Sequence, residues 1–412
     1  MAELLIRPGH NDHVAIANLL IPEARATLAS VRRPISRLVV DAHLALAYPQ
    51  YRETAAEAGT PLIIDPRTDL LQVDTDRRVS WRKLPYASDV AWGERIVNPF
   101  DLAALVQATV DFQVKHGASA IVSPYFYARS PEDPAFSATL QALRMTVRHL
   151  RQARINLPLI AVLAGSHRGF ARTETFNNGL DRFALAALDV GPQMLAFALS
   201  PNGNGKDGQS KVAQLFTAAQ RLKSTGATVV AWRQGFFGPA LVAAGIDGYE
   251  TGTGTGEKTD FSAAFGNVKP GSRDGGGGGS PWPVFFEALG RSLPGPTAQL
   301  LLEDQVARSL IMCRDERCCA HGAASMVSRD NRRQHNIRSR AKALRDIEQM
   351  PHASWRLHQI AKDAYANTVT TMKINKILEE KTGISGKLPT TSHEALAHVA
   401  EILSRSHSPR AA

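Results

Sequence analysis

The sequence predicts an α/β fold, a (β/α)8 barrel of the TIM type followed by a basic, mainly helical C-terminal extension. Short aliphatic runs alternate with longer helical patterns along most of the chain. The runs lack polar–apolar alternation, which is typical of strands covered on both faces. About eight such units over roughly 280 residues fit a closed barrel better than an open doubly wound sheet. The doubly wound alternative also lacks a G-x-G-x-x-G motif after the first run.

The predicted strands follow one another at spacings that leave room for a helix between them. In chain order they are residues 37–41, 61–65, 118–125, 157–165, 194–200, 227–233, 246–249 and 309–313. Helical patterns such as 136–153 and 210–224 separate them. We therefore expect a barrel domain over residues 1–312, with a flexible glycine-rich insert at 271–280, and an extension over 313–412.

Composition and charge restrict the class of protein. The chain has 412 residues, of which 44% are hydrophobic, enough for a large core. We expect a cytoplasmic protein without a membrane span, because no apolar run is long enough and polar residues interrupt the N-terminus. The three cysteines are clustered, which favours a reduced compartment. The formal net charge of +10 fits a polyanionic partner such as nucleic acid or an ordinary basic enzyme.

Polar side chains recur where the predicted strands end, which is where a barrel of this type places its active site. Turn chemistry explains any one of them, so the prediction rests on the set. The candidate catalytic residues at these ends are Asp41, Asp65 and Asp247, and the candidate substrate-binding side chains are Tyr125, Arg233, Gln234 and Glu250. Asp315 as a catalytic residue and Gln72 as a substrate-binding one become candidates through a family resemblance given below.

A glycine run follows the seventh predicted strand. It reads AGIDGYETGTGTGE over residues 244–257 and places Gly252, Gly254 and Gly256 at alternate positions. Glycine lets backbone N–H groups approach a ligand closely, so such a turn can hold a phosphate or a flat polar ring. The alternative is a flexible loop without a ligand.

A cysteine and histidine cluster begins where the predicted barrel ends. Its members Cys313, Cys318, Cys319 and His335 are the residue types that bind structural zinc. The C-x4-C-C spacing is irregular for a zinc ribbon or finger, and ordinary buried thiols are the alternative.

A basic helical pattern follows over residues 329–345. Ile337, Ala341 and Leu344 form its expected buried stripe. Such a helix can follow a phosphate backbone, and a solvated basic face is the alternative. The expected nucleic-acid contacts are Arg332, Arg333, Arg338 and Arg340.

Three motifs together resemble the tRNA-guanine transglycosylase family. DGYETGTGTGE, from Asp247 to Glu257, is similar to the family's D-G-Y-x-x-G-G-L-x-V-G-E, without its Gly-Gly-Leu core and one residue shorter. Asp65 and Gln72 match the ends of the family's D-S-G-G-F-Q with wider spacing. The Cys/His cluster follows the barrel as the family's zinc site does, without the C-x-C-x-x-C spacing. The departures indicate a remote branch, for example one that acts on DNA or in phage defence.

The resemblance implies a base exchange in tRNA or DNA, in which guanine is replaced by a modified deazaguanine. One aspartate attacks the sugar and a second handles the proton of the base. Asp65 matches the base-handling position and the glycine run would line the base pocket. Asp41, Asp247 and Asp315 stay open as nucleophiles, because no aspartate matches that position cleanly.

Two other functions stay open. The first is a barrel enzyme on a small phosphorylated or carboxylated substrate, with Arg67, Arg168 and Arg233 as anion-binding groups. The second is a non-catalytic nucleic-acid-binding subunit of a larger complex. The sequence also leaves open whether the chain forms a homodimer.

Overall fold

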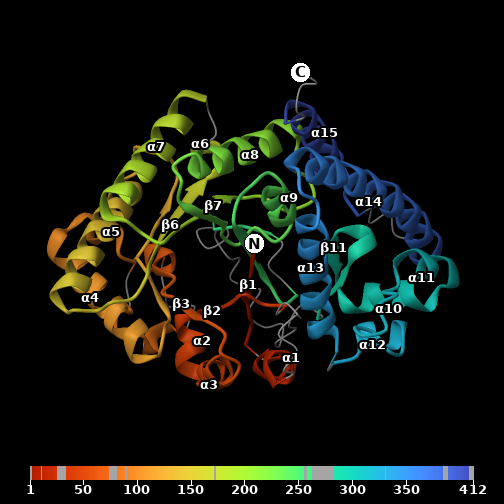
Figure 1. Cartoon of the computed structure of the whole chain (residues 1–412), viewed down its shortest axis with the longest axis horizontal. Helices are drawn as coiled ribbons and strands as arrows, with labels where there is room; N and C mark the ends of the chain where they lie inside the picture. The colour runs from red at the N-terminus through yellow and green to blue at the C-terminus, as the bar shows by residue number, and fades with distance from the viewer. Residues whose placement is uncertain are drawn as a thin grey trace.

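Eight parallel strands close into a barrel at the centre of the molecule (Figure 1). The computed structural model describes residues 2–10, 12–25, 34–73, 81–88, 91–170, 173–254, 258–261, 282–329, 331–383 and 388–407. The barrel strands are β1 (Glu3–Arg7), β2 (Arg37–Asp41), β3 (Leu62–Asp65), β4 (Ala120–Val122), β6 (Leu159–Ser166), β7 (Met194–Ser200), β8 (Thr228–Ala231) and β9 (Gly248–Gly252). Pairing of β1 with β9 and of β4 with β6 closes the ring, which confirms the predicted TIM-type fold. The two-residue strand β5 (Tyr127–Ala128) extends the sheet beside β6.

The barrel interior changes from apolar to charged along the strands. Leu5, Val39 and Ile63 belong to an interior cluster of aliphatic and aromatic side chains. Side chains two positions apart on a strand share a face, so the next inward positions on these strands are Arg7, Asp41 and Asp65. Asp41 lies beside Asp65 in the β2–β3 register. The sequence pattern therefore builds a packed floor and a charged mouth from the same three strands.

Helices surround the barrel and bury their apolar faces against it. They include α1 (His13–Arg25), α3 (Gln50–Glu57), α4 (Pro99–Lys115), α5 (Pro134–Gln152), α7 (Thr173–Val190), α8 (Gln209–Lys223) and α9 (Gly238–Ala243), with short α2 (Ala42–Ala47) and α6 (His167–Phe170). Two of these helices begin at a capping residue that the local sequence supplies. Asn98 caps α4 and Asp133 caps α5, each followed by a proline at the first helical position, where its missing N–H costs nothing. The 3-10 turns η1 (Thr68–Gln72), η3 (Trp81–Lys83) and η4 (Gly93–Val97) lie between β3 and α4.

An insert between β9 and α13 forms a second, smaller core. It contains β10 (Val284–Phe286), η7 (Glu287–Leu289), β11 (Arg291–Leu293), α10 (Gly295–Glu303), α11 (Gln305–Ile311) and α12 (Ala323–Val327). Strands β10 and β11 pair antiparallel, and apolar residues of the insert pack together with Cys318 and Cys319. We call residues 282–329 the cysteine module.

One strand prediction was wrong and one strand was not predicted. Residues 309–313 do not form the eighth strand, because Asp304 caps a helix through the Ala307 N–H at 2.8 Å and α11 runs to Ile311. The missing strand is β1, a five-residue run that the sequence analysis passed over.

The chain after the module is helical, as predicted. Helix α13 (Arg332–Glu348) packs against α1, α9 and β1, so it stands where the barrel needs its last helix. Helices α14 (Ala353–Thr382) and α15 (Thr391–Ser406) pack against each other and lie over α9 and α8 (Figure 1). The boundary predicted at residue 312 stays a prediction, but the chain beyond it contributes Ile337 and Leu344 to the barrel core. None of the helices in the described ranges has the length and apolarity that a bilayer crossing requires.

Candidate functional site

Arg7 is the centre of the charged barrel mouth. It ends β1, is 9% exposed, and its guanidinium contacts three carboxylates from three other strands. Nη2 donates to Asp65 Oδ2 at 2.7 Å and to Glu250 Oε2 at 3.0 Å, while Nε and Nη1 donate to Glu250 and Asp41. Burial lowers the pKa of Arg7, but Glu250, Asp41 and Asp65 outweigh it and raise the pKa above its ordinary value. Arg7 is therefore charged and neutralised by its own chain.

Asp65 lies in the mouth, at the end of β3 where the sequence places it, but both of its carboxylate oxygens already accept hydrogen bonds from the protein. The side chain is 0% exposed. Besides Arg7, the Tyr125 hydroxyl lies 3.0 Å from both carboxylate oxygens, and the Arg67 N–H donates to Oδ1 at 2.9 Å. Burial raises the pKa of Tyr125, and the negative charge of Asp65 raises it further. The Tyr125 hydroxyl is therefore neutral and donates to the Asp65 carboxylate. Asp65 is suited to hold Tyr125 and Arg7 in position.

Asp41 is the most accessible carboxylate of the Arg7 cluster. Its side chain is 13% exposed, against 1% for Glu250 and 0% for Asp65. Arg67, which also forms a two-bond pair with Asp69 at 2.9 and 3.0 Å, reaches Asp41 Oδ2 at 3.3 Å. Burial raises the pKa of Asp41, but Arg7 and Arg67 outweigh it and hold the pKa well below its ordinary value. Asp41 is therefore ionised and a weak base.

Arg233 differs from the other two mouth arginines because no carboxylate pairs with it among the described residues. It follows β8 in the left-handed backbone region, φ 57°, and is partly buried. Its guanidinium lies over the Phe261 ring, 5.3 Å from the ring centroid. Burial lowers its pKa, Arg67 and Arg7 lower it further, and Asp41 offsets only part of this. An arginine stays protonated even so, which leaves a positive charge that no described carboxylate contacts directly.

Buried polar atoms without a partner occur next to Arg233. Strands β7 and β8 are followed by Asn202 and Gln234, which are 1% and 0% exposed. Within the described residues, Asn202 Oδ1 and Gln234 Oε1 lack a hydrogen bond, and so does the indole N–H of Trp232. Such atoms indicate an unplaced ligand or water, because buried polar groups are otherwise paired.

Two of the predicted substrate-binding features serve the scaffold. The Gln72 side chain is hydrogen-bonded to the backbone of Tyr127. Its Oε1 accepts from the Tyr127 N–H at 2.7 Å, and its Nε2 donates to the Tyr127 carbonyl at 3.0 Å. A Cβ at Gly254 would come within 2.8 Å of Pro283, so glycine is needed there for close packing. Gly252 ends β9 beside Arg7 and stays a candidate, while Gly256 and the insert at 271–280 lie outside the described residues.

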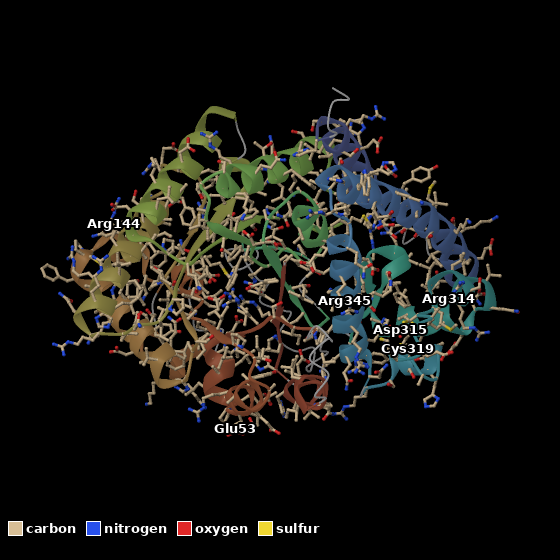
Figure 2. All side chains as sticks on the ribbon, in the orientation of Figure 1. Glu53, Arg144, Arg314, Asp315, Cys319 and Arg345 are labelled. Carbon is tan, nitrogen blue, oxygen red and sulfur yellow. The ribbon has the colours of Figure 1, made fainter. Side chains whose placement is uncertain are left out.

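The structure does not bring Asp247 or Asp315 to the mouth. Asp247 precedes β9, at the opposite end of the barrel, where Lys223 pairs with it at 2.7 Å. Asp315 lies in the cysteine module, where its carbonyl accepts from the Cys318 and Cys319 N–H groups. Figure 2 places Asp315 near Cys319, away from the barrel strands. Asp41 and Asp65 are the two predicted catalytic aspartates that lie together.

The four predicted metal ligands form a compact cluster. The ligand atoms of Cys313, Cys318, Cys319 and His335 all lie within 4.8 Å of one another. Sγ of Cys318 is 3.8 Å from Sγ of Cys319, and His335 Nδ1 is 3.3 and 3.4 Å from these two sulfurs. A tetrahedral zinc ion with Zn–S of ~2.3 Å and Zn–N of ~2.0 Å separates its ligand atoms by about 3.5 to 3.8 Å. The set fits such an ion.

The surroundings of the cluster also suit a metal. The other ring nitrogen of His335, Nε2, is 2.8 Å from the Phe285 carbonyl, so it carries the proton and leaves the Nδ1 lone pair facing the thiols. Hydrogen bonds from Cys318 and then Cys319 lower the pKa of Cys313, and the same bonds to Cys313 raise the pKa of Cys318 and Cys319, so the three thiols favour one thiolate, at Cys313. Four protein ligands leave no open position, so a bound ion would be structural and would fasten the cysteine module to α13.

The arginines predicted to contact nucleic acid are engaged within the protein. Arg332 lies 4.5 Å from the Trp282 ring centroid and Arg340 4.3 Å from that of Phe285. Arg333 pairs with Asp12, which also accepts from the Thr253 hydroxyl. Arg338 donates to the Arg317 carbonyl at 3.0 Å. Helix α13 therefore does not present these four groups as one solvent-facing row.

The sequence analysis did not identify Arg7, whose guanidinium pairs with carboxylates from three other strands at the mouth. Its signal is the run ELLIR followed by Pro8 and Gly9, an aliphatic run closed by turn residues like those of β2 and β3. Sequence alone does not show that Arg7 faces three carboxylates, because those contacts depend on barrel closure.

Comparisons with known proteins name no family for this chain. No protein family and no curated protein matches it. Solved structures give slight likenesses. (S)-3-O-geranylgeranylglyceryl phosphate synthase from Thermoplasma acidophilum is 14% identical with a TM-score of 0.31, over 61% of this chain and 85% of that one. A lyase or mutase from Burkholderia cenocepacia, itself assigned only provisionally, is 13% identical with a TM-score of 0.34, over 64% and 78%. The carboxyl transferase domain of Rhizobium etli pyruvate carboxylase is 11% identical with a TM-score of 0.36, over 98% and 60%. Likenesses at this level carry no argument about function.

Proposed function

We propose that this chain is a TIM-barrel enzyme that acts on a small anionic substrate, phosphorylated or carboxylated, at the barrel mouth. The observation that carries the proposal is Arg233. Its guanidinium has no carboxylate partner within the described residues, whereas Arg7 and Arg67 are neutralised by the chain. An anion from outside would give this guanidinium the direct partner that it lacks.

The position of Arg233 supports a phosphate in particular. Strands β8 and β9 are the seventh and eighth of the barrel, and Arg233 and Gly252 lie at their C-terminal ends. TIM-barrel enzymes frequently bind phosphate with the loops that follow these two strands. The unpaired Gln234 and Asn202 atoms add polar groups at the same end of the barrel.

Asp41 is the reacting group we assign to this site. An ionised carboxylate with a depressed pKa is a poor proton acceptor, so it would stabilise a developing positive charge or attack as a nucleophile. Arg7 and Arg67 would keep it ionised in the closed site. Asp65 and Glu250 would hold Arg7 in place.

Anion binding tests this proposal directly. We expect inorganic phosphate or succinate to bind one site by titration calorimetry, and Arg233→Gln to raise Kd at least tenfold, the loss of about 1.5–3 kcal/mol from a charge-assisted hydrogen bond. Thermal stability should change little, because the substitution removes repulsion from Arg67 and Arg7 together with the attraction of Asp41. Arg221→Gln, which breaks an exposed pair with Asp181, is the matched control. Equal affinity in both variants would reject the assignment.

Base exchange at a glycosidic bond is a second candidate, favoured by the Cys3His cluster that follows the last barrel strand. In that reaction Asp41 would serve as the nucleophile.

A polyanionic substrate would need exposed cations, and Arg144, Arg148 and Arg151 of α5 are exposed. Arg144 projects on the far side of the barrel from α13 (Figure 2). Incubation with labelled guanine and tRNA or DNA tests this candidate, and a lack of incorporation into both removes it.

A further inference from the structure

The segment that follows β9 lies across one side of the barrel mouth. Residues 258–261 come after the glycine run, and Thr259 forms an antiparallel bridge with Asn202, which follows β7. The two residues exchange two backbone hydrogen bonds of 3.0 Å, and the Phe261 N–H donates to the Ser200 hydroxyl at 2.8 Å. We call residues 258–261 the strap. Its bonds connect the segment after the eighth barrel strand to the end of the sixth.

Burial alternates along the strap. Thr259 and Phe261 are 1% and 3% exposed, whereas the side chains of Lys258 and Asp260 are 53% and 19% exposed and pair with each other at 2.7 Å. Alternate side chains of an extended segment point to opposite sides, so Thr259 and Phe261 form the inner face of the strap. The Phe261 ring belongs to the interior cluster of the barrel and stacks on Tyr127, with centroids 5.8 Å apart and planes 5° from parallel. The strap therefore places an aromatic ring in the mouth.

The inner face of the strap holds Arg233 at two points. The Thr259 hydroxyl donates to the Arg233 carbonyl, and the Arg233 guanidinium lies over the Phe261 ring. Stacking uses the flat face of a guanidinium and leaves its N–H groups, which lie in the plane, for an acceptor. The strap therefore fixes the plane in which Arg233 can donate hydrogen bonds to an anion.

We propose that Phe261 is a positioning residue of the anion site, which holds the Arg233 guanidinium in the plane where its N–H groups meet a phosphate or carboxylate. The inference rests on the function proposed for the mouth and adds the strap to that site. Phe261 acts through Arg233 and does not touch the anion. A guanidinium that is fixed before binding loses less conformational entropy when the anion binds. The loop after the eighth strand, which often contributes to phosphate sites in TIM barrels, then takes part in this one.

A double-mutant cycle on the full chain tests the proposal, with inorganic phosphate as the probe and titration calorimetry as the measurement. We expect Phe261→Leu, which keeps an apolar side chain but removes the ring, to raise Kd about fivefold. Phe261→Tyr, which keeps the ring, should bind phosphate nearly as well as the parent. In the Arg233→Gln background, Phe261→Leu should change Kd no further, because the ring acts through the guanidinium. General damage to the fold would raise Kd in both backgrounds.

Phe183→Leu is the matched control. Phe183 is a buried ring of α7 that belongs to the core between the barrel and its helices, not to the interior cluster. Its substitution should lower the melting temperature by a similar amount and leave Kd unchanged. Thr259→Val, which removes the hydrogen bond to the Arg233 carbonyl, gives a second cycle with the same expected pattern if Phe261→Leu does not fold.

The outcomes separate this inference from the proposed function. A rise in Kd in Arg233→Gln but not in Phe261→Leu would overturn the positioning role and keep the anion site. A lower Kd in Phe261→Leu would also overturn it, because the strap would then obstruct the site. An equal rise in both backgrounds would assign Phe261 a structural role only. Phosphate that binds neither the parent nor Phe261→Tyr would remove the proposed function itself, and this inference with it.

Discussion

The barrel mouth and the Cys3His cluster both gather ionisable side chains in a buried place, but they differ in what completes them. At the mouth, the chain supplies both signs of charge, and Arg7 and Arg67 are paired with Asp41, Asp65, Asp69 and Glu250. In the cluster, three thiols and one imidazole face one another in a set that could hold a metal ion. Arg7 and Arg67 are therefore balanced by the chain itself, whereas the donor atoms of the cluster are all of the kind that a metal ion brings together.

Metal removal should have the largest effect and should act on one region only. Structural zinc contributes about 10–16 kcal/mol of apparent binding free energy in small zinc peptides, so its loss should unfold the cysteine module. We expect close to one zinc per chain by elemental analysis, lost in Cys318→Ser. Hydrogen exchange should then rise over residues 282–329 and stay low in the barrel strands.

His321→Ala is the matched control for the metal prediction. His321 lies in the same turn but outside the four-residue set, and it is exposed. Full zinc content in Cys318→Ser, or equal loss in His321→Ala, would contradict the ligand assignment.

Removal of Arg7 should have the next largest effect. Arg7→Met leaves Glu250 and Asp65, both essentially buried, without their cation, and breaking a buried pair in this way costs about 3–5 kcal/mol. Urea unfolding of the zinc-loaded protein measures the loss. Arg37→Met, which breaks a partly exposed pair with Glu3, should cost about 1 kcal/mol or less. Similar losses in the two variants would mean that the mouth network is not the stabilising unit described here.

Acid should produce the smallest of the three effects, and it should act at the mouth. The pKa of Asp41 is depressed in the folded chain, so this group contributes stability above its unfolded pKa of about 3.9 and loses it as pH falls toward the lower folded value. We expect the urea midpoint to fall between about pH 4 and pH 2.5, and to fall less steeply in Asp41→Asn. Parallel pH profiles in the two proteins would exclude Asp41 as a contributor.

Part of this structure could be predicted from local sequence and part could not. Residues 37–41 and 194–200 were predicted as strands with the bounds that the structure has, because their apolar residues are flanked by clear breaks. Residues 309–313 were predicted wrongly, since a five-residue apolar run does not distinguish a buried strand from a helix. Asp247 was placed at the wrong end of its strand, because β9 begins at Gly248 and continues into the glycine run.

The basic helix shows why exposure is hard to predict. The pattern of α13 is correct, and Ile337, Ala341 and Leu344 are buried as expected. Three of its arginines, however, lie against rings from the cysteine module or pair with Asp12. An arginine has a long apolar stem and a flat cation that stacks on aromatic rings, so its charge alone does not place it in solvent.

The sequence by itself determined the chemical groups available to this protein: the alternation of strands and helices, the carboxylates at strand ends, and the Cys3His set. Only the tertiary structure decided which of them act together. Barrel closure brings β1 between β2 and β9, which places Arg7 among Asp41, Asp65 and Glu250 and leaves Arg233 without a carboxylate partner in the described chain. The physical reason is that a charge acts over a few ångströms in space, and the residues that meet at the mouth lie up to 243 positions apart in the chain.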